Sequence, residues 1–112
     1  MTVTLEDIVY ETRRIALEEP DHVYTRLQRC TNLQLDEASG DLVGSCIIGK
    51  AMLAAGVPLG LIAEHNGAGF RVLAAALGFD SYAPEANWLD RVQASQERRL
   101  PWGEAVSRAD LG

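Results

Sequence analysis

The sequence has few cysteines and no long apolar run. Two cysteines among 112 residues cannot form the disulfide framework that holds many small secreted proteins, so the fold depends on an apolar core. No apolar run reaches the roughly 18 residues of a membrane-spanning helix, and the first residues lack the basic and apolar regions of a secretory signal. We therefore expect a cytoplasmic protein without a membrane-embedded part.

Basic residues are also scarce relative to acidic ones. The chain has 16 Asp and Glu against 10 Lys and Arg, which gives a net charge of −6. Nucleic-acid-binding proteins usually gather positive charge on one face, because much of their affinity comes from displacing phosphate counterions. The charge balance therefore disfavours a nucleic-acid partner.

The chain does contain enough apolar sequence for one core. Hydrophobic residues make up 47% of it and charged residues 23%, which is typical of one compact domain. A chain of this length buries roughly two-thirds of the surface that it exposes when unfolded. We expect residues 1–112 to form a single helical domain that needs no metal and no cofactor.

The first helix is predicted from apolar residues that recur on one helical face. It should begin after Thr4, whose side chain can cap the first turn, and run from Leu5 to about Glu19. Pro20 disfavours a helical conformation in the residue before it, so the helix should end there.

The second half of the chain reads as short helices separated by glycine and proline. Ser45 is a candidate N-cap, and Gly56 and Gly78 stand where a left-handed residue closes a helix. The helices expected in this half cover approximately residues 46–55, 59–64, 69–77, 84–100 and 102–109.

In residues 21–43 the apolar residues do not recur at helical spacing. Polar and apolar residues alternate over 32–36, and residues 37–41 supply turn chemistry, which predicts a short irregular β-hairpin. The fold class is therefore mainly α, a small bundle of about five or six helices with this hairpin between helix 1 and helix 2. The expected core contains Ile8, Ile15, Ile48, Met52, Leu61, Ile62, Leu73, Leu77, Leu89 and Val92.

Four sequence runs also carry a resemblance. They are residues 45–49 (SCIIG), 56–59 (GVPL), 88–96 (WLDRVQASQ) and 101–109 (PWGEAVSRA). In combination they resemble a family of small uncharacterised proteins of actinobacteria and their bacteriophages. The resemblance implies a small helical cytosolic protein of phage or actinobacterial origin and carries over no activity.

Metal binding is disfavoured by spacing. The only thiols and imidazoles are His22, Cys30, Cys46 and His65, and they are separated by 8, 16 and 19 residues. Structural zinc sites usually supply their ligands in pairs only a few residues apart. A disulfide between Cys30 and Cys46 is chemically possible, but a reducing compartment favours two small buried thiols.

Two functional alternatives stay open. A thiol at a helix N-terminus loses its proton more easily, so Cys46 could act as a nucleophile with His65 as base and Asn66 orienting it. The run from Met52 to Glu64 also resembles a helix-turn-helix core, which would make the protein a DNA-binding regulator. The second helix of that pair offers no donor for bases or phosphates, which argues against it.

The leading hypothesis is a non-enzymatic protein-protein interaction or accessory factor, of phage type as the resemblance implies. It would engage a host factor or a second copy of itself through a helical surface. Tyr82 and Trp102 are the candidate contact residues, because aromatic side chains dominate interface energetics. No catalytic residue is predicted.

Overall fold

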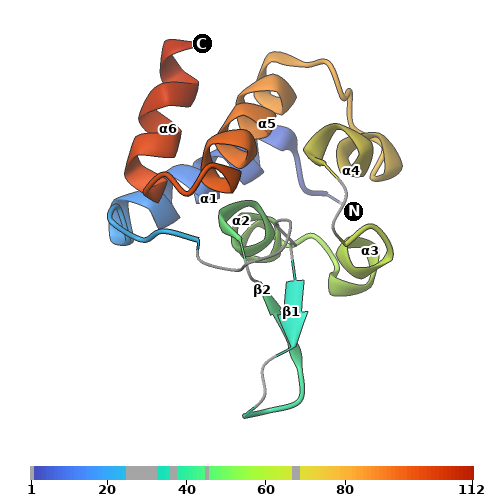
Figure 1. Ribbon diagram of the computed structural model, residues 1–112. Helices are drawn as coiled ribbons and strands as arrows, with labels where there is room; N and C mark the ends of the chain where they lie inside the picture. Colours follow the sequence, from blue (N-terminus) through green and yellow to red (C-terminus); the bar gives the residue numbers. More distant parts are fainter. Residues whose placement is uncertain (1, 25–32, 36–37, 45, 67–68) are drawn as a thin grey trace.

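Six helices and two short strands make up the secondary structure of the residues that the computed structural model describes, which are 2–24, 33–35, 38–44, 46–66 and 69–112 (Figure 1). The elements are α1 (Leu5–Glu18), β1 (Leu33–Leu35), β2 (Leu42–Gly44), α2 (Ile47–Ala55), α3 (Leu59–Glu64), α4 (Phe70–Ala76), α5 (Pro84–Glu97) and α6 (Trp102–Leu111). The prediction of a mainly helical fold is confirmed. Within these ranges, each helix is too short or too polar to cross a membrane.

The start of α1 is fixed by two reciprocal hydrogen bonds. The Asp7 amide donates to Thr4 Oγ1 at 3.1 Å, and the Thr4 amide donates to Asp7 Oδ2 at 2.9 Å. These bonds satisfy backbone donors that have no partner inside the helix. The helix ends at Glu18, two residues before Pro20, so both predicted ends are confirmed.

The caps of α2 follow the sequence only in part. Cys46, not Ser45, is its N-cap, and Cys46 Sγ accepts a hydrogen bond from the Gly49 amide at 3.4 Å. Ser45 itself lies outside the described residues. The helix closes at Gly56 with φ +104°, and Gly78 follows α4 with φ +87°, as predicted for both glycines.

The two strands pair antiparallel with Leu33 opposite Gly44 and Leu35 opposite Leu42. They extend away from the helices as a two-stranded element and do not form a layer of the fold (Figure 1). Residues 25–32 and 36–37 lie outside the described part, so the hairpin as a continuous unit stays a prediction. The side chain of Asn66 supports β1, because its Oδ1 accepts from the Leu33 amide at 2.9 Å and its Nδ2 donates to the Leu33 carbonyl at 3.2 Å.

The core lies where α1, α2, α4 and α5 face one another, with α6 along one side of α5 (Figure 1). Eight of the ten predicted core residues are buried. Leu61 was predicted wrongly and is 36% exposed, because the six-residue α3 buries only Ile62. Leu77 packs against the core but is only partly buried, since the chain leaves α4 at that residue.

Two buried glutamines on α5 connect the helices in a way that the sequence does not predict. Gln96 Oε1 accepts from the Ile47 amide at 2.8 Å and from Trp102 Nε1 at 2.9 Å. Gln93 Oε1 accepts from the Phe70 amide at 2.8 Å. Ile47 and Phe70 begin α2 and α4, so α5 caps two other helices from inside the core.

Candidate binding groove

Trp102 lies in the core, which corrects its prediction as a surface contact. Its side chain is 0% exposed, and its ring centroid lies 4.2 Å from that of His22. The Trp102 amide donates to the His22 carbonyl at 2.9 Å, so the first turn of α6 is held against the segment that follows α1. The ring is therefore covered by its own chain.

Tyr82 is 77% exposed, on the loop between α4 and α5. The Arg71 guanidinium lies 5.4 Å from the centroid of its ring. Tyr82 is accessible to a partner, but with Trp102 buried the two predicted contact residues do not form one surface.

The alternative of a thiol enzyme lacks an accessible sulfur at Cys46. Cys46 is 0% exposed and its sulfur accepts the Gly49 amide, which is the geometry of a helix cap. The Asn66 amide group bonds to the backbone of β1 at Leu33. Cys30 lies outside the described residues, so its pairing with Cys46 is not described. Across the described ranges, no three His, Cys, Asp or Glu side chains are grouped closely enough to hold a metal ion.

The α2–α3 pair has the left-handed glycine expected of a helix-turn-helix at Gly56. However, α3 carries Leu59 and Leu61 as exposed apolar side chains and no basic residue. A recognition helix needs donors for base edges and phosphates, so this pair is not a candidate DNA-binding surface.

A cavity with a volume of about 480 Å³ lies between α1 and α6. The end of α1 and the residues after it form one wall, and α6 forms the other. The lining residues are Arg13, Ala16, Leu17, Pro20, Gly103, Val106, Ser107 and Asp110. We call this cavity the α1–α6 groove.

The middle of the α1–α6 groove is apolar. Leu17 is 83% exposed on one wall, and Val106 is half-buried on the other. An added Cβ at Gly103 would lie 3.0 Å from Pro20 Cβ and 3.1 Å from the Pro20 carbonyl oxygen, so a larger residue would require Pro20 to shift by a few tenths of an ångström. Glycine at this position therefore allows α6 to approach Pro20 closely at this end of the groove.

One end of the groove is polar and held by charge. The Arg13 guanidinium donates to both carboxylate oxygens of Asp110, at 3.0 and 2.7 Å, and lies 4.6 Å from the centroid of the Trp88 ring. Trp88 Nε1 donates to Asp110 Oδ1 at 2.8 Å. The hydrogen bonds from Arg13 are the main reason why the pKa of Asp110 is lowered, and the bond from Trp88 adds to them. These contacts tie α1, α5 and α6 together.

Leu17 was missed because only the buried stripe of α1 was considered. The buried residues of this helix are Leu5, Ile8, Thr12, Ile15 and Ala16. Leu17, like Tyr10, is a large apolar residue of α1 outside that stripe, and an apolar residue in such a position is the sequence signal for an exposed contact. The groove residues of α6 also follow a sequence pattern, because they recur at helical spacing from Gly103 to Asp110 and so share one face of the helix.

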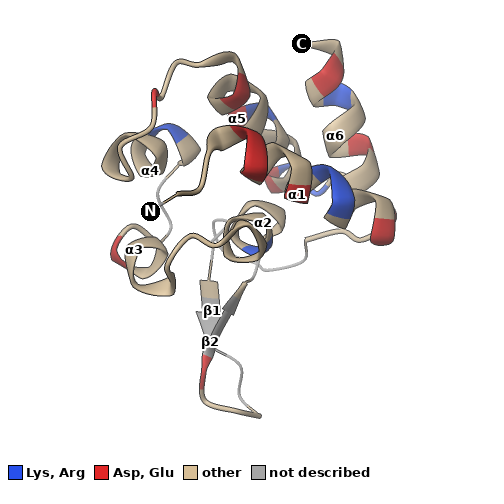
Figure 2. Cartoon of the chain, turned by 180° about the vertical axis from the view of Figure 1, so that it is seen from behind, with Lys and Arg blue, Asp and Glu red and all other residues tan. Residues whose placement is uncertain are grey.

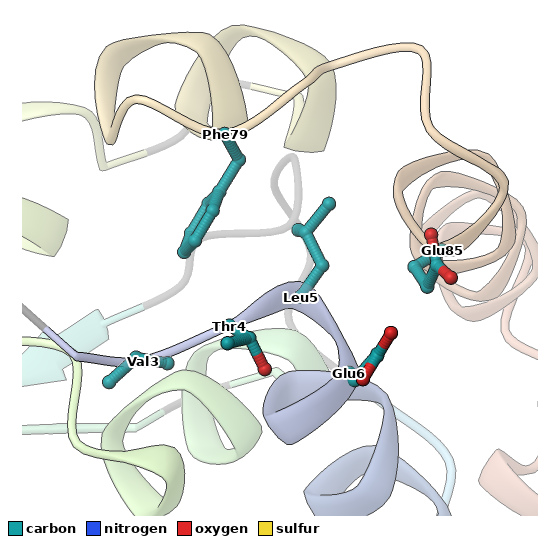
Figure 3. A pocket seen from close by; sticks show the side chains of 6 residues that line it. All are labelled: Val3, Thr4, Leu5, Glu6, Phe79 and Glu85. Carbon is teal, nitrogen blue, oxygen red and sulfur yellow. The ribbon is translucent and has the colours of Figure 1, made fainter.

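A smaller cavity of about 320 Å³ lies beside the start of α1. Phe79 lies on one side of it, and the carboxylates of Glu6 and Glu85 lie on the other (Figure 3). Val3 and Leu5 complete the apolar part and belong to the edge of the core. This cavity is a depression between packed helices and offers less exposed apolar surface than the α1–α6 groove.

Comparisons of the chain with protein-family models, with curated proteins and with solved structures found no match.

Proposed function

We propose that the protein is a non-enzymatic interaction factor that binds an apolar segment of a partner protein in the α1–α6 groove. The observation that carries this proposal is Leu17, which is 83% exposed on the wall of a cavity of about 480 Å³. Burying a leucine side chain contributes about 1.5–3 kcal/mol relative to leaving it in water. A partner that covers Leu17 and Val106 therefore gains affinity at this place.

The charges around the groove favour a partner segment with basic residues beside its apolar ones. Glu18, Glu19 and Asp21 are exposed next to Leu17, and the whole chain carries a net charge of −6. Glu18 is paired with Arg14 and Glu19 with Lys50, so the charge that a partner meets comes mainly from Asp21 and the overall acidic balance. Figure 2 shows acidic segments, interspersed with basic ones, on α1 and α6, the two helices that form the groove. Complementary charge increases the association rate and suppresses wrong partners more than it adds to affinity.

The polar end of the groove fixes the orientation of the bound segment. Arg13 and Asp110 satisfy each other, so a partner that inserted a charge between them would have to replace both of these hydrogen bonds. The Ser107 hydroxyl donates to the Gly103 carbonyl at 3.0 Å. Apolar side chains therefore fit the middle of the groove and polar backbone fits its end.

The family resemblance extends this proposal to a biological setting. If the chain is of phage or actinobacterial origin, the partner is a host protein, and the protein acts as an accessory factor on it. The exposed side chains support binding better than catalysis, because the candidate nucleophile, the Cys46 sulfur, is buried and accepts a hydrogen bond from the Gly49 amide.

A photo-crosslinking amino acid at position 17 tests the proposal in an actinobacterial lysate. We expect one protein to be linked from this position. The matched control carries the same amino acid at position 72, because Val72 is 60% exposed but lies on α4, away from the groove lining. The partner should not be linked from there.

A charge in the groove provides the second measurement. Leu17→Glu should weaken binding of the captured partner at least tenfold, whereas Val72→Glu should leave it unchanged. Circular dichroism checks that both variants are folded. Equal linking from positions 17 and 72, or unchanged binding by a folded Leu17→Glu variant, would refute the groove as the binding site. Linking only to a second copy of the chain would refute the host partner.

A further inference from the structure

Three arginines meet at a separate cavity between α5 and α6, in a chain that is acidic overall. The cavity has a volume of about 240 Å³. It is lined by Arg91, Ala94, Ser95, Arg98, Arg108 and Ala109. Residues 91, 94, 95 and 98 share one face of α5, and two alanines leave room between the longer side chains. We call this cavity the arginine pocket.

Two of the three guanidinium groups are held in place by the protein. Arg91 donates from Nε and Nη2 to the Ala109 carbonyl, at 3.3 and 2.9 Å. Arg108 donates from Nε to Glu104 Oε1 at 3.1 Å, and its Nη2 lies at the same distance. An arginine has five N–H donors, so both residues keep donors for a ligand. Holding them in advance lowers the entropy that binding would cost.

Arg98 has a different position. It is exposed at the end of α5, and its side chain makes no hydrogen bond or ion pair with any part of the chain that the structure describes. Its guanidinium is therefore available without breaking an existing contact. The Ser95 hydroxyl lies one helical turn before it and supplies a further donor.

The charge around the pocket suits a doubly charged anion. Three arginines contribute three positive charges, and Glu104, paired with Arg108, removes one. The C-terminal end of α6 adds partial negative charge, which Arg91 counters through the Ala109 carbonyl. Asp110, whose pKa Arg91 helps to lower, is itself paired with Arg13, so the cavity keeps a net charge of about two positive charges. A phosphomonoester carries between about −1.5 and −2 charges at neutral pH.

We propose that the arginine pocket binds the dianionic phosphoryl group of a phosphomonoester. A carboxylate has two oxygens and one charge, so it would leave guanidinium donors without acceptors, whereas a phosphoryl group presents three oxygens. The volume is below that of pockets that enclose whole drug-sized ligands, so the phosphoryl group enters and the rest of the molecule stays outside. The two sources of such a group are a small phosphorylated molecule and a phosphorylated peptide.

This site goes beyond the proposed function, because it uses other residues of α6 than the groove does. Gly103, Val106, Ser107 and Asp110 face the groove, whereas Arg108 and Ala109 face the pocket. Failure of either proposal leaves the other standing.

Titration with inorganic phosphate, followed by ¹H–¹⁵N NMR at low ionic strength, tests the proposal. We expect saturable shifts of the Arg91, Ser95, Arg98 and Arg108 signals with a Kd of about 1 mM. Arg98→Gln should weaken binding about tenfold, as expected for loss of a charged hydrogen bond. Arg71→Gln is the matched control, because Arg71 is an arginine of α4 outside the pocket, and it should bind as the wild type does.

The charge of the ligand gives an independent readout. Lowering the pH from about 7.5 to about 5.5 protonates phosphate towards the monoanion and should weaken its binding, while sulfate, which keeps both charges, should bind equally at both values. Comparing the affinities of glycerol phosphate and a short phosphoserine peptide then shows whether the phosphoryl group comes from a small molecule or from a phosphorylated peptide. Absence of saturable shifts up to about 20 mM phosphate, far above the expected Kd, would overturn the proposal. Equal weakening by Arg71→Gln and Arg98→Gln would overturn it as well.

Discussion

Replacing Gln96 with leucine removes an acceptor that two buried N–H groups share. Gln96 Oε1 accepts from the Ile47 amide and from Trp102 Nε1, and both Gln96 and Trp102 are 0% exposed. Water cannot reach this place without opening the core. In Gln96→Leu the first amide of α2 and the indole of α6 therefore lose this acceptor at the same time.

The expected loss in the free energy of unfolding follows from the number of N–H donors that lose their acceptor. Each buried donor left without an acceptor costs about 1–3 kcal/mol. The added apolar surface of leucine offsets part of this loss. We expect Gln96→Leu to lower the free energy of unfolding by about 2–4 kcal/mol, which corresponds to a fall in Tm of about 10–20 °C for a domain of this size.

Gln93→Leu is the matched control, because Gln93 Oε1 accepts from a single amide, that of Phe70. Its cost should be about half that of Gln96→Leu. Urea unfolding, measured by circular dichroism and by tryptophan fluorescence, gives both values. If Gln96→Leu were as stable as the wild type, or if Gln93→Leu cost more, the argument from shared acceptors would be refuted.

Two further predictions concern the groove walls. Asp110→Asn should lower stability by up to about 1 kcal/mol at neutral pH, since the ion pair with Arg13 is largely exposed. Because the pKa of Asp110 is lowered in the folded protein, the stabilisation by its carboxylate is complete above the ordinary value of 3.8 and is lost as the pH falls through the lowered pKa. If the difference in unfolding free energy between wild type and Asp110→Asn stayed constant in urea unfolding down to about pH 2, this prediction would be contradicted. Gly103→Ala should cost about 1–2 kcal/mol in thermal unfolding, because the new Cβ meets Pro20, whereas Gly60→Ala, with open space around its Cβ, should be neutral or slightly stabilising; equal effects would contradict the close approach.

The local features of the fold were predictable because they depend on neighbouring residues. The Thr4 and Asp7 cap and the left-handed Gly56 and Gly78 need only a few residues of sequence to be recognised. The cap of α2 was assigned one residue too early. Serine is a better cap by preference, yet Cys46 occupies that position.

Long-range contacts were not predictable from spacing. A glutamine in an amphipathic helix is usually placed on the solvent side, but Gln93 and Gln96 are buried because the starts of α2 and α4 need acceptors. Trp102 was predicted as a contact residue, and its burial depends on the approach of α6 to Pro20 and His22. These contacts join residues that are far apart in the chain.

For the α1–α6 groove, the sequence shows the character of individual residues but not which helices lie next to each other. The sequence marks Leu17 as an apolar residue outside the stripe of α1, but it does not show which helix lies opposite. The pairing is held by Arg13 and Trp88, which bind Asp110, and by the hydrogen bonds of Trp102 and Gly103 to the segment after α1. The pairing of α1 with α6 was therefore not available from sequence.

Helix α6 is attached at both ends, and this matters for what the groove can bind. At its start, the amides of Trp102 and Gly103 donate to the carbonyls of His22 and Pro20, both at 2.9 Å. At its end, Asp110 accepts from α1 and α5. A wall held in this way loses little conformational freedom when a partner binds, so the ordering cost falls mainly on the partner. Affinity at the α1–α6 groove should therefore depend more on how ordered the partner segment already is than on movement of this protein.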